Sequence, residues 1–155
     1  LTRLRGVDPA HATAVSPALV ADVPACLLSM TSRGQGAGDH LVLVDDARIA
    51  GTPALLVNPR EPLSTRAVFA SWDGQDRGGL DDWRAGRNDL EAPARALVPA
   101  IGDVLDWLAS QPGVTFVRMS GSGATCFALF TDEEARDAAA SACPDHWWHL
   151  ATFLR

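Results

Sequence analysis

Residues 118–127 read Arg-Met-Ser-Gly-Ser-Gly-Ala-Thr-Cys-Phe, and this stretch decides the fold more than any other. Four small residues, Ser120 to Gly123, separate two segments rich in apolar, β-branched and aromatic side chains, at 114–119 and 124–130. Such segments favour strands, and a short connection that contains glycine favours a hairpin. We therefore predict two strands joined by a tight turn at Ser120 to Gly123.

Residues 88–110, which precede this hairpin, carry the strongest helical pattern of the chain. A proline in a helix interior removes a backbone hydrogen bond and clashes with the preceding turn, so Pro93 and Pro99 predict two helices or one kinked helix. After the hairpin, Thr131-x-x-Glu134 has the spacing of a capping box and predicts a helix that continues to about Cys143. The apolar residues of the 88–110 pattern recur at three- and four-residue steps, or multiples of them: Leu90, Leu97, Ile101, Val104, Leu105 and Leu108.

The remaining elements complete a mixed pattern. Ser64 or Thr65 can cap a short helix that runs toward Trp72. The order after residue 40 is β, β, α, α, β, β, α, β, which predicts an α+β two-layer sandwich with helices on one sheet face and a ferredoxin-like arrangement. Further strands are predicted at 41–44, 54–57 and 147–154, a glycine-rich loop at 33–38, a proline-containing loop at 58–65 and an exposed irregular segment at 73–87.

Composition excludes several classes of function. The net charge of −6 and the scattered basic residues argue against nucleic acid as a partner. All 13 basic residues are arginine, so this chain supplies no phosphate-binding lysine. No apolar run approaches the ~20 residues that a membrane helix needs. Three widely spaced cysteines fit neither a metal site nor a disulfide framework, which indicates a reducing, cytoplasmic setting.

The turn at Ser120 to Gly123 is the first candidate site. Gly121 and Gly123 permit positive φ, so that backbone N–H groups can converge on an anion, and the two serines add hydroxyl groups. Glycine is also the usual residue of a plain hairpin turn, and spacing alone favours that simpler interpretation.

Three other segments carry candidate residues. Asp22, held beside Pro24, is a candidate general base, although an aspartate there is more often a helix cap or turn residue. Thr65 offers a hydroxyl group and Phe69 an aromatic face for a base, although Phe69 taken alone is more typical of a core. For the segment 87–91 we favour a helix start with acidic residues at the positive helix end. No carboxylate or cysteine pattern completes a metal site around the histidines.

Taken together, five segments resemble the carboxy-terminal half of the GHMP kinases. The glycine-rich stretch is common to that superfamily, whereas the asparagine–proline and Asn-Asp-Leu-Glu segments resemble the branch that phosphorylates 4-diphosphocytidyl-2-C-methyl-D-erythritol. The segments, in order, are ADVP at 21–24, RGQGAGDHL at 33–41, LLVNPREPLSTRAVF at 55–69, RNDLEAPA at 87–94 and MSGSGATCFALF at 119–130.

The resemblance implies ATP-dependent phosphorylation of the 2-hydroxyl of that substrate, a cytidine diphosphate derivative, with Mg²⁺ accompanying ATP. It implies that Asp22 is the catalytic base, that Thr65 and Phe69 bind substrate with Phe69 near the cytosine, and that Ser120, Gly121, Ser122 and Gly123 form a loop near the phosphates. Val20 stands where the family usually has glycine, two positions before Asp22. The catalytic role of Asp22 is therefore implied by the resemblance alone.

The resemblance also implies a division of the chain. Residues 1–30 are expected to be a helical remnant of the ATP-binding lobe, and residues 31–155 the carboxy-terminal domain. The chain opens at Leu1 rather than methionine, and the family's lysine and main ATP loop would precede it. We therefore expect a chain that is inactive alone and either associates with itself or needs a separate amino-terminal chain. Two alternatives stay open: a non-catalytic ferredoxin-like binding or regulatory module, and another GHMP small-molecule kinase.

Overall fold

The computed structural model describes residues 31–35, 40–44, 49–75, 77–79, 82–84 and 86–154. The chain divides into two compact units, one formed by Leu1–Ala50 with Arg155 and the other by Gly51–Leu154. The expected helical segment at 1–30, which includes Asp22, lies outside the described residues. The proposed division at residue 30 therefore stays a prediction.

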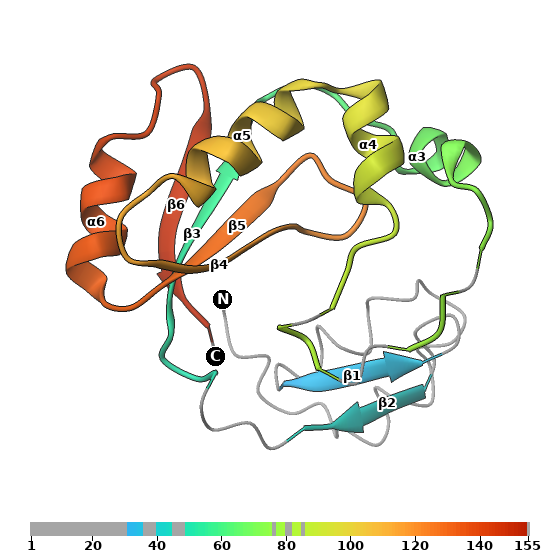
Figure 1. The fold of residues 1–155 in the computed structure, drawn as a ribbon, viewed down its shortest axis with the longest axis horizontal. Helices are drawn as coiled ribbons and strands as arrows, with labels where there is room; N and C mark the ends of the chain where they lie inside the picture. The colour runs from blue at the N-terminus through green and yellow to red at the C-terminus, as the bar shows by residue number, and fades with distance from the viewer. Residues whose placement is uncertain are drawn as a thin grey trace, which may run out of the picture. The chain divides into compact units, whose positions relative to one another are not determined.

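The first unit contains a small antiparallel hairpin. Strand β1 (Ser32–Gln35) pairs with β2 (His40–Leu43), with Ser32 opposite Leu43 (Figure 1). The N–H of Val44 donates to the carbonyl of Thr31 at 3.0 Å and extends the pairing by one step. The strand predicted at 41–44 is confirmed, but the loop predicted at 33–38 is wrong in its first half. Pairing with a neighbouring strand satisfies the backbone there and outweighs the low strand preference of glycine.

The second unit is built on a four-stranded antiparallel sheet with the order β4-β5-β3-β6 (Figure 1). The two strands of the predicted hairpin, β4 and β5, are neighbours. The first and last strands of the unit, β3 and β6, also pair, which gives the strand order of a ferredoxin-like sandwich and confirms the predicted α+β fold. The strands are β3 (Pro53–Asn58), β4 (Val114–Met119), β5 (Cys126–Phe130) and β6 (Trp148–Phe153).

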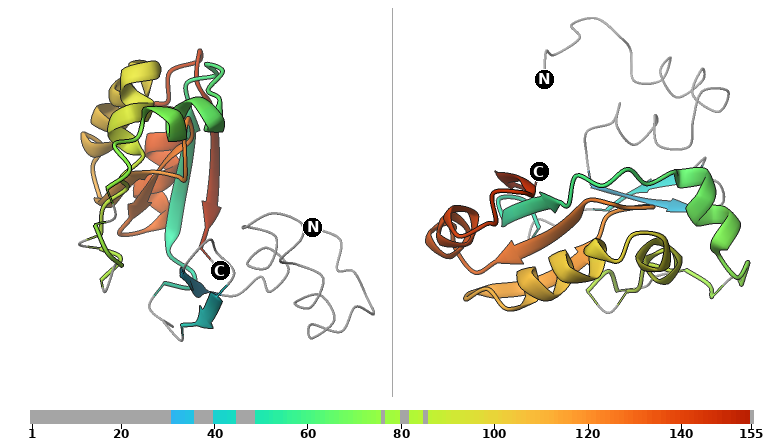
Figure 2. Two further views of the ribbon diagram at one scale, coloured as in Figure 1. Left: turned by 90° about the vertical axis from the view of Figure 1, so that its right-hand side faces the viewer. Right: turned by 90° about the horizontal axis from the view of Figure 1, so that it is seen from above.

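Four helices accompany this sheet: α3 (Thr65–Ser71), α4 (Glu91–Leu97), α5 (Ala100–Ala109) and α6 (Glu133–Ser141). Helices α5 and α6 lie on one face of the sheet, as Figure 2 shows. None of the helices in the described ranges is long and apolar enough to cross a membrane. Residues from α5 and from one face of β3, β4 and β5 form the buried core, with Leu55, Val57, Ile101, Val104, Leu108, Met119, Cys126 and Phe130 at its centre.

The two prolines divide the predicted helical stretch as expected. Pro93 lies in the first turn of α4, where its missing N–H has no partner to lose, and Pro99 is the N-cap of α5. The amphipathic pattern therefore forms two consecutive helices.

The start of α6 differs from the prediction by one residue. Asp132, not Thr131, is the N-cap, and its carboxylate accepts from the N–H of Ala135 at 2.8 Å. The Thr131 hydroxyl donates to Asp132 Oδ2 at 2.9 Å and so supports the cap from outside. A carboxylate in this position accepts the free helical N–H and complements the positive helix end, which a neutral hydroxyl does less well.

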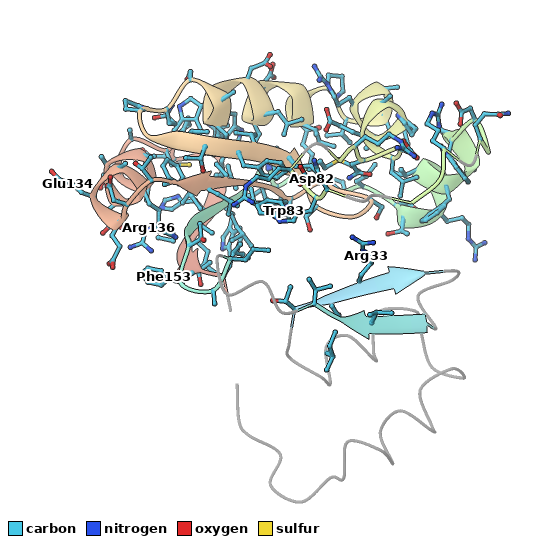
Figure 3. The ribbon with its side chains drawn as sticks, turned by 60° about the horizontal axis from the view of Figure 1, so that its bottom comes forward. Arg33, Asp82, Trp83, Glu134, Arg136 and Phe153 are labelled. Atoms are coloured by element: carbon cyan, nitrogen blue, oxygen red, sulfur yellow. The ribbon has the colours of Figure 1, made fainter. Side chains whose placement is uncertain are left out.

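A buried arginine joins α6 to the edge strand. Arg136 is only 6% exposed, and its guanidinium lies 4.6 Å from the centre of the Phe153 ring (Figure 3). Its Nη1 donates to the carbonyl of Thr152 at 2.8 Å, and its Nε pairs with Asp137 at 2.8 Å. The buried charge is therefore matched by hydrogen bonds and by ion pairs.

Candidate functional site

The turn between β4 and β5 is closed by two backbone hydrogen bonds. The N–H of Ser120 donates to the carbonyl of Thr125 at 2.8 Å, and the N–H of Gly123 donates to the carbonyl of Ser120 at 2.9 Å. Within the described part of the chain, the N–H groups of Gly121 and Ser122 donate to no partner. The turn therefore has the free donors that an anion site needs.

The two glycines of the turn serve different purposes. Gly123 has a φ of +88°, and a Cβ there would lie 2.8 Å from Met119 Sδ and 3.1 Å from Leu63 Cδ2, so only glycine fits. Gly121 has a φ of +54° but faces open space, and a Cβ at this position would meet no atom within 4 Å. The open side of the turn at Gly121 is therefore where a ligand can approach the backbone closely.

Two residues that the sequence assigned to different parts of the site are in contact. The hydroxyl groups of Thr65 and Ser122 lie 2.9 Å apart, at hydrogen-bond distance. Thr65 begins α3, whose N-cap Ser64 accepts from the N–H of Ala67 at 3.4 Å. The capped start of α3 thus places a predicted substrate residue against the predicted phosphate loop.

Phe69 follows Thr65 by one helical turn, so the two residues lie on one face of α3. Phe69 is 53% exposed, whereas its neighbour Val68 is fully buried. The interpretation of Phe69 as a core residue is therefore wrong. An exposed aromatic ring beside the Thr65–Ser122 pair is available to stack on a flat ligand.

Asn88 reaches the turn from the segment before α4. Its Nδ2 donates to the carbonyl of Met119 at 3.0 Å and to that of Gly121 at 2.8 Å, while its Oδ1 accepts from the N–H of Leu90 at 3.0 Å. The predicted helix start at 87–91 is confirmed, since α4 begins at Glu91. The contact with the turn was not predicted, because an asparagine before a helix is explained by the helix alone.

Asn58 makes a second link that sequence reasoning missed. Its Nδ2 donates to the Thr125 hydroxyl at 2.9 Å, and its Oδ1 accepts from the N–H of Arg60 at 2.7 Å. Arg60 has a φ of +63°, which is rare for a residue with a side chain. The asparagine at the end of β3 therefore holds both the far side of the turn and the loop that leads to α3.

A depression of about 750 Å³ lies along β4, and Asn88 and Glu91 form part of its wall. Burial lowers the pKa of Arg118, whose Nη2 donates to the carbonyl of Gly86. Its guanidinium lies 4.6 Å from the centre of the Phe116 ring. Although arginines are scattered in the sequence, the fold gathers four of them around this depression: Arg84, Arg87, Arg95 and Arg118.

Asp22, the predicted general base, lies outside the described residues. Among the residues that are described, no three histidine, cysteine, aspartate or glutamate side chains are grouped so that they could hold a metal ion. The described site therefore consists of hydroxyl groups, backbone donors and one exposed ring, which can bind an anionic ligand and a flat one.

Comparison with known proteins gives the context of this site. Residues 75–147 match the family model described as GHMP kinases C terminal. A protein from Novosphingobium aromaticivorans named 4-diphosphocytidyl-2-C-methyl-D-erythritol kinase is 52% identical over 153 residues, which are 95% of this chain and 53% of that protein. A protein of the same name from Rhizorhabdus wittichii is 51% identical over 96% of this chain and 54% of its own length. The chain spans about half the length of the curated relatives it matches.

A solved structure agrees with the sequence relatives. The crystal structure of a 4-(cytidine 5'-diphospho)-2C-methyl-D-erythritol kinase superposes with a TM-score of 0.78 at 27% identity. The similarity covers 94% of this chain and 56% of the other. The fold, the family match and the relatives therefore agree that this chain has the fold of a GHMP kinase carboxy-terminal domain and is similar over most of its length to kinases of 4-diphosphocytidyl-2-C-methyl-D-erythritol.

Proposed function

We propose that this chain forms the substrate-binding part of an ATP-dependent kinase that phosphorylates the 2-hydroxyl of 4-diphosphocytidyl-2-C-methyl-D-erythritol. The names of the relatives support this proposal, and one structural observation carries it. Thr65 and Ser122, expected from the resemblance to contact substrate and phosphate respectively, have their hydroxyl groups 2.9 Å apart. Two predicted binding regions thus meet at one place in the fold.

In this proposal each group has a definite role. The free N–H groups of Gly121 and Ser122 bind phosphate oxygens, because backbone donors that are already oriented bind an anion with little reorganisation. The Thr65 hydroxyl orients the substrate, and the exposed ring of Phe69 stacks on the cytosine. Phosphoryl transfer depends mainly on positioning and charge stabilisation, so a site of this kind contributes directly to the rate.

The proton acceptor and the metal complete the proposal. Asp22 is proposed as the base that accepts the proton of the substrate hydroxyl. Mg²⁺ is proposed to accompany ATP, but the described residues present no cluster of three metal-binding side chains, so we assign it no ligand. The lysine and the main ATP loop of the family are proposed to come from the part of the relatives that this chain does not span.

The test is a phosphorylation assay with ATP and 4-diphosphocytidyl-2-C-methyl-D-erythritol. The chain is assayed alone, and then joined to the remaining half of the Novosphingobium aromaticivorans relative. We expect phosphorylation of the 2-hydroxyl only in the joined protein, and its loss on Asp22→Asn. A joined protein that folds, binds ATP and phosphorylates another alcohol but not this one would contradict the proposed substrate.

A second assay separates the alternative members of the superfamily. Cytidine diphosphate is added as a competitor in the joined protein. We expect inhibition, because the exposed Phe69 ring is proposed to bind cytosine. The expected inhibition is competitive with the phosphate acceptor, whereas inhibition that is competitive only with ATP would place cytidine diphosphate in the ATP site and leave the alternative kinases open.

A further inference from the structure

Asn88 holds two carbonyl groups that flank Ser120, and no role in the site follows for it from the family match or the relatives' names. The three hydrogen bonds of its carboxamide fix which end is nitrogen. Leu90 presents a donor to one end, and Met119 and Gly121 present acceptors to the other, so the NH₂ group must face the turn. The contact with the turn is therefore specific to an amide.

The bond to Gly121 fixes a whole peptide plane. The peptide between Gly121 and Ser122 is planar and trans, so its carbonyl and its N–H point in opposite directions. With the Gly121 carbonyl held 2.8 Å from Asn88, the N–H of Ser122 points away from Asn88. Turn types differ mainly in the orientation of this central peptide, and Asn88 therefore selects one of them.

The side chain of Ser122 is held by a different element, because its partner Thr65 belongs to α3. Its hydroxyl lies 2.9 Å from that of Thr65, while its N–H has no partner in the described ranges. Ser122 thus has a fixed backbone, a fixed side chain and one free donor. A donor that is fixed before the ligand arrives loses little entropy on binding.

We propose that Asn88 is a positioning residue that orients the central peptide of the Ser120–Gly123 turn and so directs the Ser122 N–H toward an anionic group of the ligand. The identity of that anion as a phosphate rests on the proposed function. The proposal that Asn88 orients the turn is independent of the proposed function.

The competing explanation is that Asn88 only starts α4. Asn88→Asp separates the two roles. The aspartate keeps an oxygen that accepts from the N–H of Leu90, but at pH 7 it replaces the NH₂ group with an oxygen that faces two carbonyls. Asn88→Ala removes both interactions and is the matched control. Protonation of the aspartate at low pH restores one donor.

The first measurement is the amide NMR spectrum of this chain in its three forms. In Asn88→Asp at pH 7 we expect the Gly121, Ser122 and Gly123 signals to shift and broaden, while the Leu90 signal stays near its original position. We expect the turn signals to move back as the pH falls through the titration of the new carboxyl group, with no such change in Asn88→Ala. The proposal would be overturned if the signals of Gly121, Ser122 and Gly123 were unchanged in both variants. It would also be overturned if these signals did not depend on pH in Asn88→Asp.

The second measurement is kinetic and uses the joined kinase. Loss of two neutral hydrogen bonds that orient the turn should lower kcat/KM for the phosphate-bearing substrate about tenfold in Asn88→Asp at pH 7. The deficit should become smaller at lower pH relative to the original protein. An equal and pH-independent loss in Asn88→Asp and Asn88→Ala would contradict positioning. Should the joined kinase prove inactive, the proposed function fails while the NMR result still decides the role of Asn88.

Discussion

The hydroxyl groups of Thr65 and Ser122 lie 2.9 Å apart although 57 residues separate them in the chain. One belongs to the first residue of α3 and the other to the turn between β4 and β5. The contact links the loop that follows β3 to the glycine turn, so one ligand can reach both residues. The importance of this pair can be measured in a few variants.

Removal of the Thr65 hydroxyl should affect binding more than stability. In Thr65→Val the shape is kept and one exposed hydrogen bond is lost, so the free energy of unfolding should fall by less than about 1 kcal/mol. KM for the cytidine diphosphate substrate in the joined kinase should rise about fivefold, because Ser122 loses its anchor. Thr65→Ser keeps the hydroxyl and should behave as the original. A raised KM in Thr65→Ser with a normal KM in Thr65→Val would show that the methyl group matters instead.

Phe69 should be dispensable for folding and needed for nucleotide binding. Because Phe69 is 53% exposed, Phe69→Ala should change the free energy of unfolding by less than about 0.5 kcal/mol. The adjacent Val68 is fully buried, and Val68→Ala should cost about 2 kcal/mol. Urea denaturation measures both changes, and titration with cytidine diphosphate should show weaker binding only in Phe69→Ala. Similar losses of stability in the two variants would place Phe69 in the core.

The two turn glycines should differ in their tolerance of alanine. Gly123→Ala combines a φ of +88° with a methyl group 2.8 Å from Met119 Sδ, and should cost about 2–3 kcal/mol. Gly121→Ala has a φ of +54° and open space, and should cost about 1 kcal/mol. Gly51→Ala, with a φ of +82° and no atom within 4 Å, measures the backbone cost alone. We expect Gly51 and Gly121 variants to unfold at similar urea concentrations, and a Gly123 variant equal to them would contradict the steric argument.

The cap of α6 should give stability a defined pH dependence. The N–H of Ala135 and, next, the hydroxyl of Thr131 hold the pKa of Asp132 below its ordinary value of 3.8. A lowered pKa in the folded protein means that the carboxylate stabilises above pH 3.8 and that this contribution is lost as the pH falls through the folded pKa.

Thermal unfolding from pH 7 to pH 2 measures that contribution. Asp132→Ala should lower the Tm at pH 7, and its deficit against the original protein should shrink as the pH falls below 3.8. Asp132→Asn keeps a neutral cap acceptor, so its Tm at pH 7 should lie between those of Asp132→Ala and the original protein. A deficit that is constant across the whole range would mean that the charge has no part in the cap.

Local patterns in the sequence predict most of the second unit. The hairpin at 114–130 follows from two strand-forming segments around a glycine turn, and the division of 88–110 into α4 and α5 follows from Pro93 and Pro99. These features depend on neighbours in the chain, so composition and spacing are sufficient to find them.

The parts that could not be predicted depend on distant residues. The contact of Asn88 with Gly121 spans 33 residues, and that of Asn58 with Thr125 spans 67. An asparagine has the same local preferences whether its amide meets solvent or a carbonyl on another strand. The exposure of Phe69 has the same origin, because the spacing of a seven-residue helix does not determine which of its sides is buried. The assigned roles of Thr65, Phe69, Asp22 and the turn stay predictions until the assays are made.

The way the glycine turn is held has a consequence for the order of folding. β4 and β5 are consecutive, so their hairpin can form early from short-range contacts. The groups that orient the turn arrive later, from α3 and from the segment before α4, after loops of tens of residues have closed. A newly made or partly unfolded chain would therefore have the hairpin without a binding-competent turn. A ligand would select only chains in which the last docking step is complete, and would add its binding energy to that step alone.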